Sequence, residues 1–208
     1  MLRGRLGLTA AVLVSGCAPH LYSPDDTDPP AVWVAPENTW PVSAPPDGLT
    51  GEGMEVGQTV LDVRGTDQFG DEVSLWQFSG SVVLLDISTL WCSPCQDLAR
   101  TAEATYQDYR DQGFVYFTDL HENLDGGPCS QDDLNAWAAF PAQNDDPYDL
   151  ITAPLVSDPK GRSGSIAAVR QGTYPALLVV GRDLKVAKRI DSPSDEAVRA
   201  AIEGVLAE

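Results

Sequence analysis

Basic residues are scarce in this chain of 208 residues, because 13 lysines and arginines stand against 31 aspartates and glutamates. The formal net charge is −18. A nucleic-acid-binding protein uses cations to neutralise phosphates, and electrostatic adhesion to anionic lipid uses them as well. The composition therefore argues against both partners, and it favours a well-solvated acidic surface.

Metal-binding residues are also scarce, with two histidines and four cysteines. A structural zinc site needs four ligands at short spacing. Apart from one C-x-x-C pair, the remaining candidates are isolated in the sequence: Cys17, His20, His121 and Cys129. We therefore expect no metal and no cofactor, and we interpret the paired cysteines as a redox site.

No long hydrophobic run is present at the N-terminus, where a membrane span could begin. Leu6 to Val14 is apolar over only nine residues, which as a helix would cover about 14 Å of a bilayer core about 30 Å thick. Arg3 and Arg5 precede this run, as in a signal peptide. The sequence Val14-Ser15-Gly16-Cys17 resembles a bacterial lipobox.

That resemblance implies a signal peptide over residues 1–16 and a lipidated Cys17 that anchors the chain to a membrane. Ala18 after the cysteine suggests the outer membrane by the sorting rule of enteric bacteria. We therefore expect a bacterial cell-envelope protein that faces the periplasm.

Residues 17–53 are predicted to be a disordered tether that follows the anchor. Apolar residues in this stretch show neither helical nor strand periodicity, and aspartates are frequent. The prolines are Pro19, Pro24, Pro29, Pro30, Pro36, Pro41, Pro45 and Pro46. Trp33 and Trp40 are unusual in a spacer, and they are candidates for docking on the folded domain expected over residues 54–208.

The motif Trp91-Cys92-Ser93-Pro94-Cys95 is the most informative part of the chain. It follows the apolar run Val82–Ile87, typical of a buried strand, and precedes a helical pattern from Pro94 to Gln112. The free N–H groups at a helix start favour a thiolate and lower the pKa of a cysteine there. The position therefore predicts a reactive thiol.

Further elements follow from periodicity and turn signals. Strands are predicted at Phe114–Phe117, Ala176–Val180 and Lys185–Ile190. Helices are predicted after Ser130, with Asp133 as its capping-box partner, and after Ser192. The segment between Pro141 and Pro154 is an acidic loop whose role the sequence does not indicate.

These features together resemble the thioredoxin superfamily, and specifically the TlpA/ResA-like thiol–disulfide oxidoreductases. The resemblance rests on the W-C-x-P-C element, on Thr173-Tyr174-Pro175 before an apolar strand, and on a hairpin around residues 67–71. It covers roughly residues 56–207. It implies an α/β thioredoxin fold, with a central mixed β-sheet flanked by helices and an added N-terminal β-hairpin.

The resemblance also implies the roles of individual residues. Cys92 is expected to be exposed and to attack the substrate disulfide, whereas Cys95 is expected to be buried and to resolve the mixed disulfide. Asp86 lies six residues before Cys92, where thioredoxins carry a buried carboxyl that takes the proton of the resolving thiol.

The loop before the second apolar strand completes the expected site. Pro175 is expected to form a cis peptide bond beside the disulfide, so that Tyr174 can pair with an extended substrate strand. Trp91 is expected to shield the site and to contact substrate. Cys129 is the odd cysteine; it precedes a helix start, which would lower its pKa, and a third redox thiol, an intermolecular disulfide and an inert thiol all stay open.

The sequence thus favours a membrane-tethered extracytoplasmic oxidoreductase that reduces protein disulfides and receives electrons from a membrane or periplasmic thiol donor. We expect a monomer. Alternatives are a thiol peroxidase, since Thr89 lies three residues before Cys92; a copper chaperone that uses Cys92, Cys95 and His121; and a structural lipoprotein with an idle motif.

Overall fold

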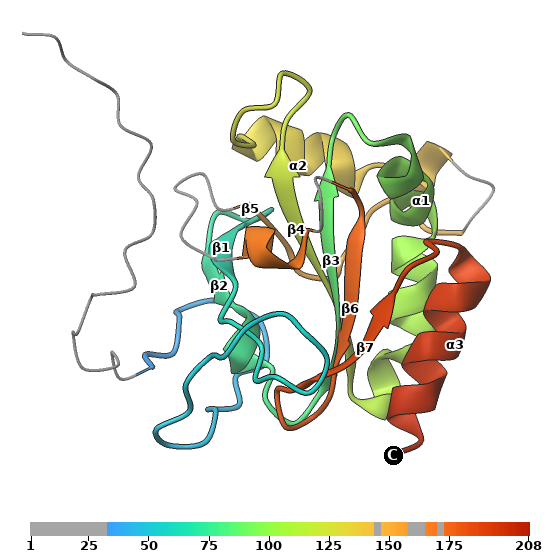
Figure 1. Ribbon diagram of the computed structural model, residues 1–208. Helices are drawn as coiled ribbons and strands as arrows, with labels where there is room; N and C mark the ends of the chain where they lie inside the picture. Colours follow the sequence, from blue (N-terminus) through green and yellow to red (C-terminus); the bar gives the residue numbers. More distant parts are fainter. Residues whose placement is uncertain (1–32, 144–146, 158–164, 170–172) are drawn as a thin grey trace, which may run out of the picture. The chain divides into compact units, whose positions relative to one another are not determined.

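The computed structural model describes residues 33–143, 147–157, 165–169 and 173–208. Within these ranges seven strands form one mixed sheet in the order β2-β1-β5-β4-β3-β6-β7 (Figure 1). The strands are β1 Arg64–Asp67, β2 Glu72–Ser74, β3 Val82–Thr89, β4 Phe114–Glu122, β5 Leu155–Ser157, β6 Ala176–Val180 and β7 Val186–Ile190. The helices are α1 Ser93–Tyr109, α2 Gln131–Ala138 and α3 Asp195–Leu206, with short 3-10 turns η1 Leu75–Gln77, η2 Arg110–Gln112, η3 Pro141–Gln143 and η4 Ser165–Ala168.

Strand β3 is the centre of the sheet, and all eight of its residues are buried. It runs parallel to β4 and antiparallel to β6. Its side chains alternate between two cores, because successive residues of a strand point to opposite faces. Val82 and Leu84 pack with α1, α2 and α3, whereas Val83, Leu85 and Ile87 pack with the N-terminal part of the chain.

Helix α1 leaves the carboxyl end of β3, as the sequence predicts. Cys92 is its N-cap, and Pro94 lies in the first turn, where a missing N–H costs no hydrogen bond. After η2, the chain turns at Gly113, whose φ of 78° is in the left-handed region that glycine adopts freely. The α-helix itself ends at Tyr109, three residues before the predicted end, and η2 extends the helical segment to Gln112, before the predicted glycine.

Most other predicted elements are confirmed, with shifted bounds. Ser130 caps α2, and Asp133 completes the capping box. Strands β6 and β7 form the expected antiparallel pair. Helix α3 begins at Asp195 rather than at Ser192, because the side chain of Ser194 accepts the N–H of Ala197 and so forms the cap.

Strand β5 is absent from the sequence prediction. It has only three residues, Leu155–Ser157, too few to show a periodic pattern. It nevertheless connects the sheet, since it pairs in parallel with β4 and antiparallel with β1. The strand exists because its neighbours supply hydrogen bonds on both sides.

Residues 33–53 differ from the expected disordered tether, because they pack against the hairpin of β1 and β2. The indole Nε1 of Trp33 donates to Ser74 Oγ at 3.1 Å, and that of Trp40 donates to Asp67 Oδ2 at 2.7 Å. Asn38 donates to the carbonyl of Glu72 at 2.6 Å, on the edge strand β2. These residues belong to the same compact unit as the sheet.

The acidic loop between Pro141 and Pro154 is tied to α1 where the structure describes it. The buried carboxylate of Glu103 accepts the backbone N–H of Thr152 and its hydroxyl, both at 2.6 Å. Ile151 and Ala153 are buried beside this contact. The loop thus covers one side of α1.

Cys17, the lipobox and Ala18 lie outside the described residues, so the lipidation hypothesis stays a prediction. Within the described ranges, no helix has the length and apolar character needed to cross a bilayer.

Candidate active site

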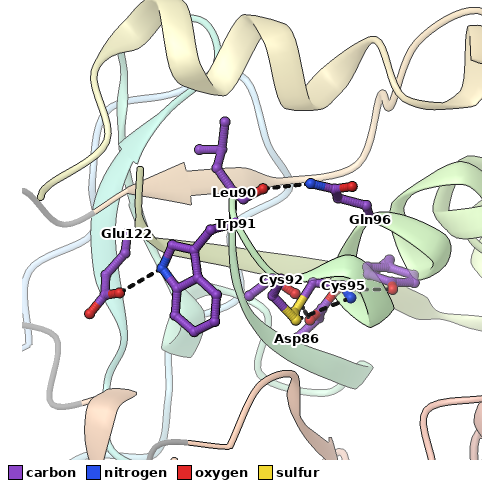
Figure 2. Close-up of a disulfide and its surroundings, with 9 residues drawn as sticks. Asp86, Leu90, Trp91, Cys92, Cys95, Gln96 and Glu122 are labelled. Atoms are coloured by element: carbon purple, nitrogen blue, oxygen red, sulfur yellow. Dashed lines mark hydrogen bonds between the residues drawn. A yellow bond between two sulfur atoms is a disulfide. The ribbon is translucent and has the colours of Figure 1, made fainter. Parts of the chain in front are cut away.

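Cys92 and Cys95 form a disulfide at the N-terminus of α1, with their Cα atoms 5.2 Å apart (Figure 2). The helix start positions both residues, since the N–H of Cys95 donates to Sγ of Cys92 at 3.3 Å. The same N–H groups would stabilise a thiolate at Cys92 after reduction. The disulfide pairing agrees with the redox interpretation of the motif.

The exposure of Cys92 differs from the sequence expectation. Only 5% of its surface is exposed, and Cys95 has none. The reason is that Cys92 turns its side chain over the helix start into the core shared with Leu90 and Leu98. A thiol of another molecule can therefore reach the disulfide only through the small exposed part of Cys92, because Cys95 has no exposed surface.

Asp86 is the buried acid of the site, with 1% of its surface exposed. It lies on the face of β3 that carries Leu84, whose side chain packs in the same core as Cys92 and Cys95. Its Oδ1 accepts the hydroxyl of Ser88 at 2.6 Å, and its Oδ2 accepts that of Tyr116 at 3.2 Å.

Burial raises the pKa of Asp86 from 3.8 to about 6, while the hydroxyls of Ser88 and Tyr116 lower it and the charge of Asp119 raises it. An acid of this strength gains and loses a proton close to neutral pH, as a proton acceptor for a thiol must.

Trp91 lies at the rim of the site, with 46% of its surface exposed. Figure 2 shows its indole directed toward Glu122, to whose Oε2 the ring N–H donates at 2.8 Å. The ring edge of Trp91 also meets Tyr174, with ring centroids 5.5 Å apart at 87°. Tyr174 in turn stacks on His121 at 6.3 Å. The rim thus joins residues from three separate segments.

The bond between Tyr174 and Pro175 is cis, as the resemblance implied. It directly precedes β6, whose first residue Ala176 pairs with Ile87 of β3. The antiparallel register therefore brings the loop of Tyr174 and Pro175 alongside the end of β3 that leads to Cys92. The cis bond is thus confirmed, and the roles of Tyr174 and Pro175 in substrate binding stay predictions.

Cys129 contradicts the expectation of an acidified thiol. Burial raises its pKa to about 12, and the charges of Asp133, Asp119 and Glu122 add to the shift. It is the free cysteine of the described chain, and only 5% of it is exposed. It precedes the cap of α2 rather than forming it, so the helix N–H groups do not serve its sulfur.

The alternative functions depend on Thr89 and His121, which lie on two different strands. Thr89 is fully buried at the end of β3, and its hydroxyl has no hydrogen-bond partner among the described residues. His121 stacks on Tyr174. In the part of the chain that the structure describes, no three His, Cys, Asp or Glu side chains gather to hold a metal ion.

Sequence reasoning missed three residues that support the site: Ser88, Tyr116 and Glu122. Ser88 could have been found, since it lies two residues after Asp86 and so on the same face of the strand. Tyr116 and Glu122 gave no local signal, because the pairing of β3 with β4 brings them to the site.

Comparisons with known proteins agree with this geometry. The AhpC/TSA family matches residues 56–189. The thioredoxin-like protein YneN of Bacillus subtilis is 27% identical over 128 residues, which cover 62% of this chain. The match spans 66% of the length of YneN.

Solved structures also resemble the chain. The thioredoxin domain of a thiol–disulfide oxidoreductase from Bacteroides vulgatus superposes with a TM-score of 0.57, at 17% identity, over 75% of this chain and 99% of that one. A secreted thiol–disulfide isomerase from Corynebacterium glutamicum gives 0.56 at 15% identity, over 83% of this chain and 98% of that one. These likenesses establish the thioredoxin fold. The chain therefore belongs to the AhpC/TSA family, and within a thioredoxin fold it carries the Cys92–Cys95 disulfide at a helix start.

Proposed function

We propose that this protein reduces disulfides of extracytoplasmic proteins through the Cys92–Cys95 pair, as a lipid-anchored, TlpA/ResA-like enzyme. The observation that carries the proposal is the disulfide at the start of α1, in which Cys92 is the helix N-cap and keeps a small exposed part, whereas Cys95 has none. This asymmetry assigns attack to Cys92 and resolution to Cys95.

The reaction begins with the reduced pair. The Cys92 thiolate attacks one sulfur of a substrate disulfide, and the other substrate sulfur leaves as a thiolate and takes a proton from water. Cys95 then gives its proton to Asp86, and its thiolate attacks Sγ of Cys92. The Cys92–Cys95 disulfide forms again, the second substrate sulfur leaves as a thiolate that takes a proton from water, and Asp86 returns its proton to solvent. Two electrons have passed to the substrate, so a thiol donor must reduce the pair before the next cycle.

Substrate binding is assigned to the rim above the disulfide. We propose that the substrate strand pairs with the backbone at Tyr174, before the cis bond to Pro175, and that its side chains pack against Trp91. The contacts of Trp91 with Tyr174 and Glu122 support this assignment, since they hold an exposed aromatic ring in one orientation beside Cys92.

The experiment is a redox titration of the purified protein in glutathione or dithiothreitol buffers. We expect one reversible two-electron transition that is lost in Cys92→Ser. A potential of about −270 mV would support a reductant that depends on a dedicated donor, whereas about −120 mV would make the protein an oxidant. The absence of any reversible transition would overturn the proposal.

The lipid anchor is tested separately. We expect the protein expressed with its own N-terminus in bacteria to partition into the detergent phase of a Triton X-114 extraction, and Cys17→Ser to move to the aqueous phase. Equal partitioning of the two proteins would contradict lipidation at Cys17 and leave the redox proposal intact. The secreted relative from Corynebacterium glutamicum supports an extracytoplasmic location.

A thiol peroxidase is the second candidate. The buried hydroxyl of Thr89, without a partner among the described residues, favours it, because such a group is free to bind a small oxygen-containing substrate near Cys92. Peroxide consumption by the reduced protein tests this reading. Consumption that depends on both Cys92 and Thr89 would support it, and a rate equal to that of free thiol would exclude it.

A further inference from the structure

The Asp86 carboxyl is held by hydroxyl groups on both of its oxygens. Ser88 donates to Oδ1 at 2.6 Å, and Tyr116 donates to Oδ2 at 3.2 Å. All three side chains are buried, with 2% exposure or less. Ser88 reaches Asp86 along β3, whereas Tyr116 comes from the neighbouring strand β4. The carboxyl is therefore fixed in orientation from two strands.

We propose that Ser88 and Tyr116 are positioning residues, which orient the Asp86 carboxyl and keep it ionisable so that it accepts the proton of Cys95. This inference rests on the proposed function, because it assigns the two residues to the step in which Cys95 resolves the mixed disulfide. Neither residue touches the reacting sulfur atoms in this assignment; both act through Asp86.

The electrostatics explain why such support is needed. A carboxylate in an apolar core loses the hydration that stabilises its charge, so burial favours the protonated form. The hydroxyls of Ser88 and Tyr116 oppose burial, with Ser88 the stronger, while the charge of Asp119 works in the other direction. The two hydroxyls thus keep the proton affinity of Asp86 close to the neutral range.

Groups on three other elements lie around Asp86 and its partner Tyr116. From α1, Cys92 and Cys95 share the core on this side of the sheet. From β6, the residue that pairs with Asp86 is the apolar Leu177. From α3, Asp195 acts on Tyr116.

Tyr116 is suited to act as a permanent donor. Burial raises the pKa of Tyr116 well above its ordinary value, and the charge of Asp86 raises it further. The phenol therefore keeps its proton throughout the range in which Asp86 titrates. Its hydrogen bond favours the carboxylate without competing for the transferred proton.

The test measures the resolving step directly. The reduced protein is mixed with 5,5′-dithiobis(2-nitrobenzoic acid), which forms a mixed disulfide at Cys92, and attack by Cys95 then releases a second coloured thiolate. The rate of that second release is followed by stopped flow between pH 5 and 8.5. For the unaltered protein we expect the rate to rise with pH, with a midpoint near the pKa of Asp86, about 6.

Tyr116→Phe removes only the hydroxyl, and we expect it to move the midpoint upward by about one pH unit, since a hydrogen bond to a charged group contributes about that much. The rate should fall about tenfold below the new midpoint and converge with that of the unaltered protein above it. Ser88→Ala should shift the midpoint in the same direction. Tyr109→Phe is the matched control, because its hydroxyl binds Glu203 on α3, and it should leave the midpoint in place.

Asp86→Asn separates this inference from the function on which it rests. We expect it to abolish the midpoint, and in that background neither Tyr116→Phe nor Ser88→Ala should change the profile. If Asp86→Asn abolishes the midpoint but both hydroxyl variants keep that of the unaltered protein, the positioning role is overturned. If Asp86→Asn keeps the midpoint, Asp86 is not the proton acceptor and this inference fails with it. If the unaltered protein releases no second thiolate, the oxidoreductase proposal fails. Should Tyr116→Phe fail to fold, Ser88→Ala decides the question.

Discussion

Cys92 and Cys129 both stand at the start of a helix and are equally buried, but the groups around their sulfur atoms differ. Cys92 is the N-cap of α1, and its sulfur accepts the N–H of Cys95. Cys129 lies one residue before the N-cap of α2, where the hydroxyl of Ser130 takes the corresponding N–H group from Asp133. One residue of displacement therefore removes the sulfur from the field of the helix start.

Acidic neighbours increase the difference. Helix α2 carries Asp132 and Asp133 in its first turn, whereas the first turn of α1 carries no acid. Burial is the main cause of the raised pKa of Cys129, and Asp133 is the next. The position of Cys129 before the cap and the carboxylates in the first turn of α2 both disfavour its thiolate, whereas Cys92 as N-cap is placed to receive the N–H groups of its helix.

The largest expected effect is on activity. We expect Cys92→Ser to reduce disulfide exchange with insulin to the uncatalysed background, because the attacking sulfur is gone, whereas Cys129→Ser should keep the full rate. Turbidity of reduced insulin is the measurement. A loss of activity in Cys129→Ser, in a protein with unchanged circular dichroism, would break the comparison by making Cys129 a third redox thiol.

Cys129 should react with a labelling reagent about 100- to 1,000-fold more slowly than an ordinary exposed thiol. A thiol with a pKa near 12 is almost entirely protonated at pH 8. The measurement uses a variant with serine at Cys17, Cys92 and Cys95, labelled with 5,5′-dithiobis(2-nitrobenzoic acid) in native buffer and in guanidinium chloride. Rapid labelling of the native variant would show that Cys129 is accessible and acidic.

Asp86, the proposed proton acceptor for Cys95, should destabilise the folded protein at neutral pH. Its pKa is raised in the folded state from 3.8 to about 6, so the folded protein binds the proton more tightly than the unfolded chain does. The contribution of Asp86 is therefore most favourable below pH 4 and declines as the pH rises through 6. We expect Asp86→Asn to raise the free energy of unfolding at pH 7 by up to about 3 kcal/mol, with no gain at pH 4.

Urea unfolding at the two pH values measures this difference. The exposed Asp125→Asn is the control, and its free energy of unfolding should stay within about 0.5 kcal/mol of that of the unaltered protein. An equal change at pH 4 and pH 7 for Asp86→Asn would mean that packing, rather than ionisation, determines the effect.

The smallest expected effect isolates one charge beside Cys129. Asp133→Asn keeps an oxygen that can accept the N–H of Ser130 but removes the charge that raises the pKa of Cys129. Labelling of Cys129 in the variant without other cysteines should become about threefold faster. Asp132→Asn, in the same turn, should change the rate less. Equal acceleration by both would assign the effect to the whole helix turn.

The sequence by itself predicted the central part of the fold and the redox pair. The apolar run of β3, the helical spacing after Cys95 and the glycine at position 113 are local signals, and each led to the observed element. The carboxyl of Asp86 was also recognisable, because a charged residue in a buried strand is costly and therefore informative. The cis bond before Pro175 followed from the resemblance and not from local physics.

Only the tertiary structure decided how far these residues are exposed and which side chains contact them. The covering of Cys92, the raised pKa of Cys129 and the packing of Trp33 and Trp40 on the hairpin depend on residues far away in the sequence. Sequence spacing determines which residues share a helix start or a strand face, since those relations extend over a few residues. Burial and hydrogen bonds between strands are set by the pairing of distant segments, and that pairing brings Tyr116 and Glu122 to the disulfide site.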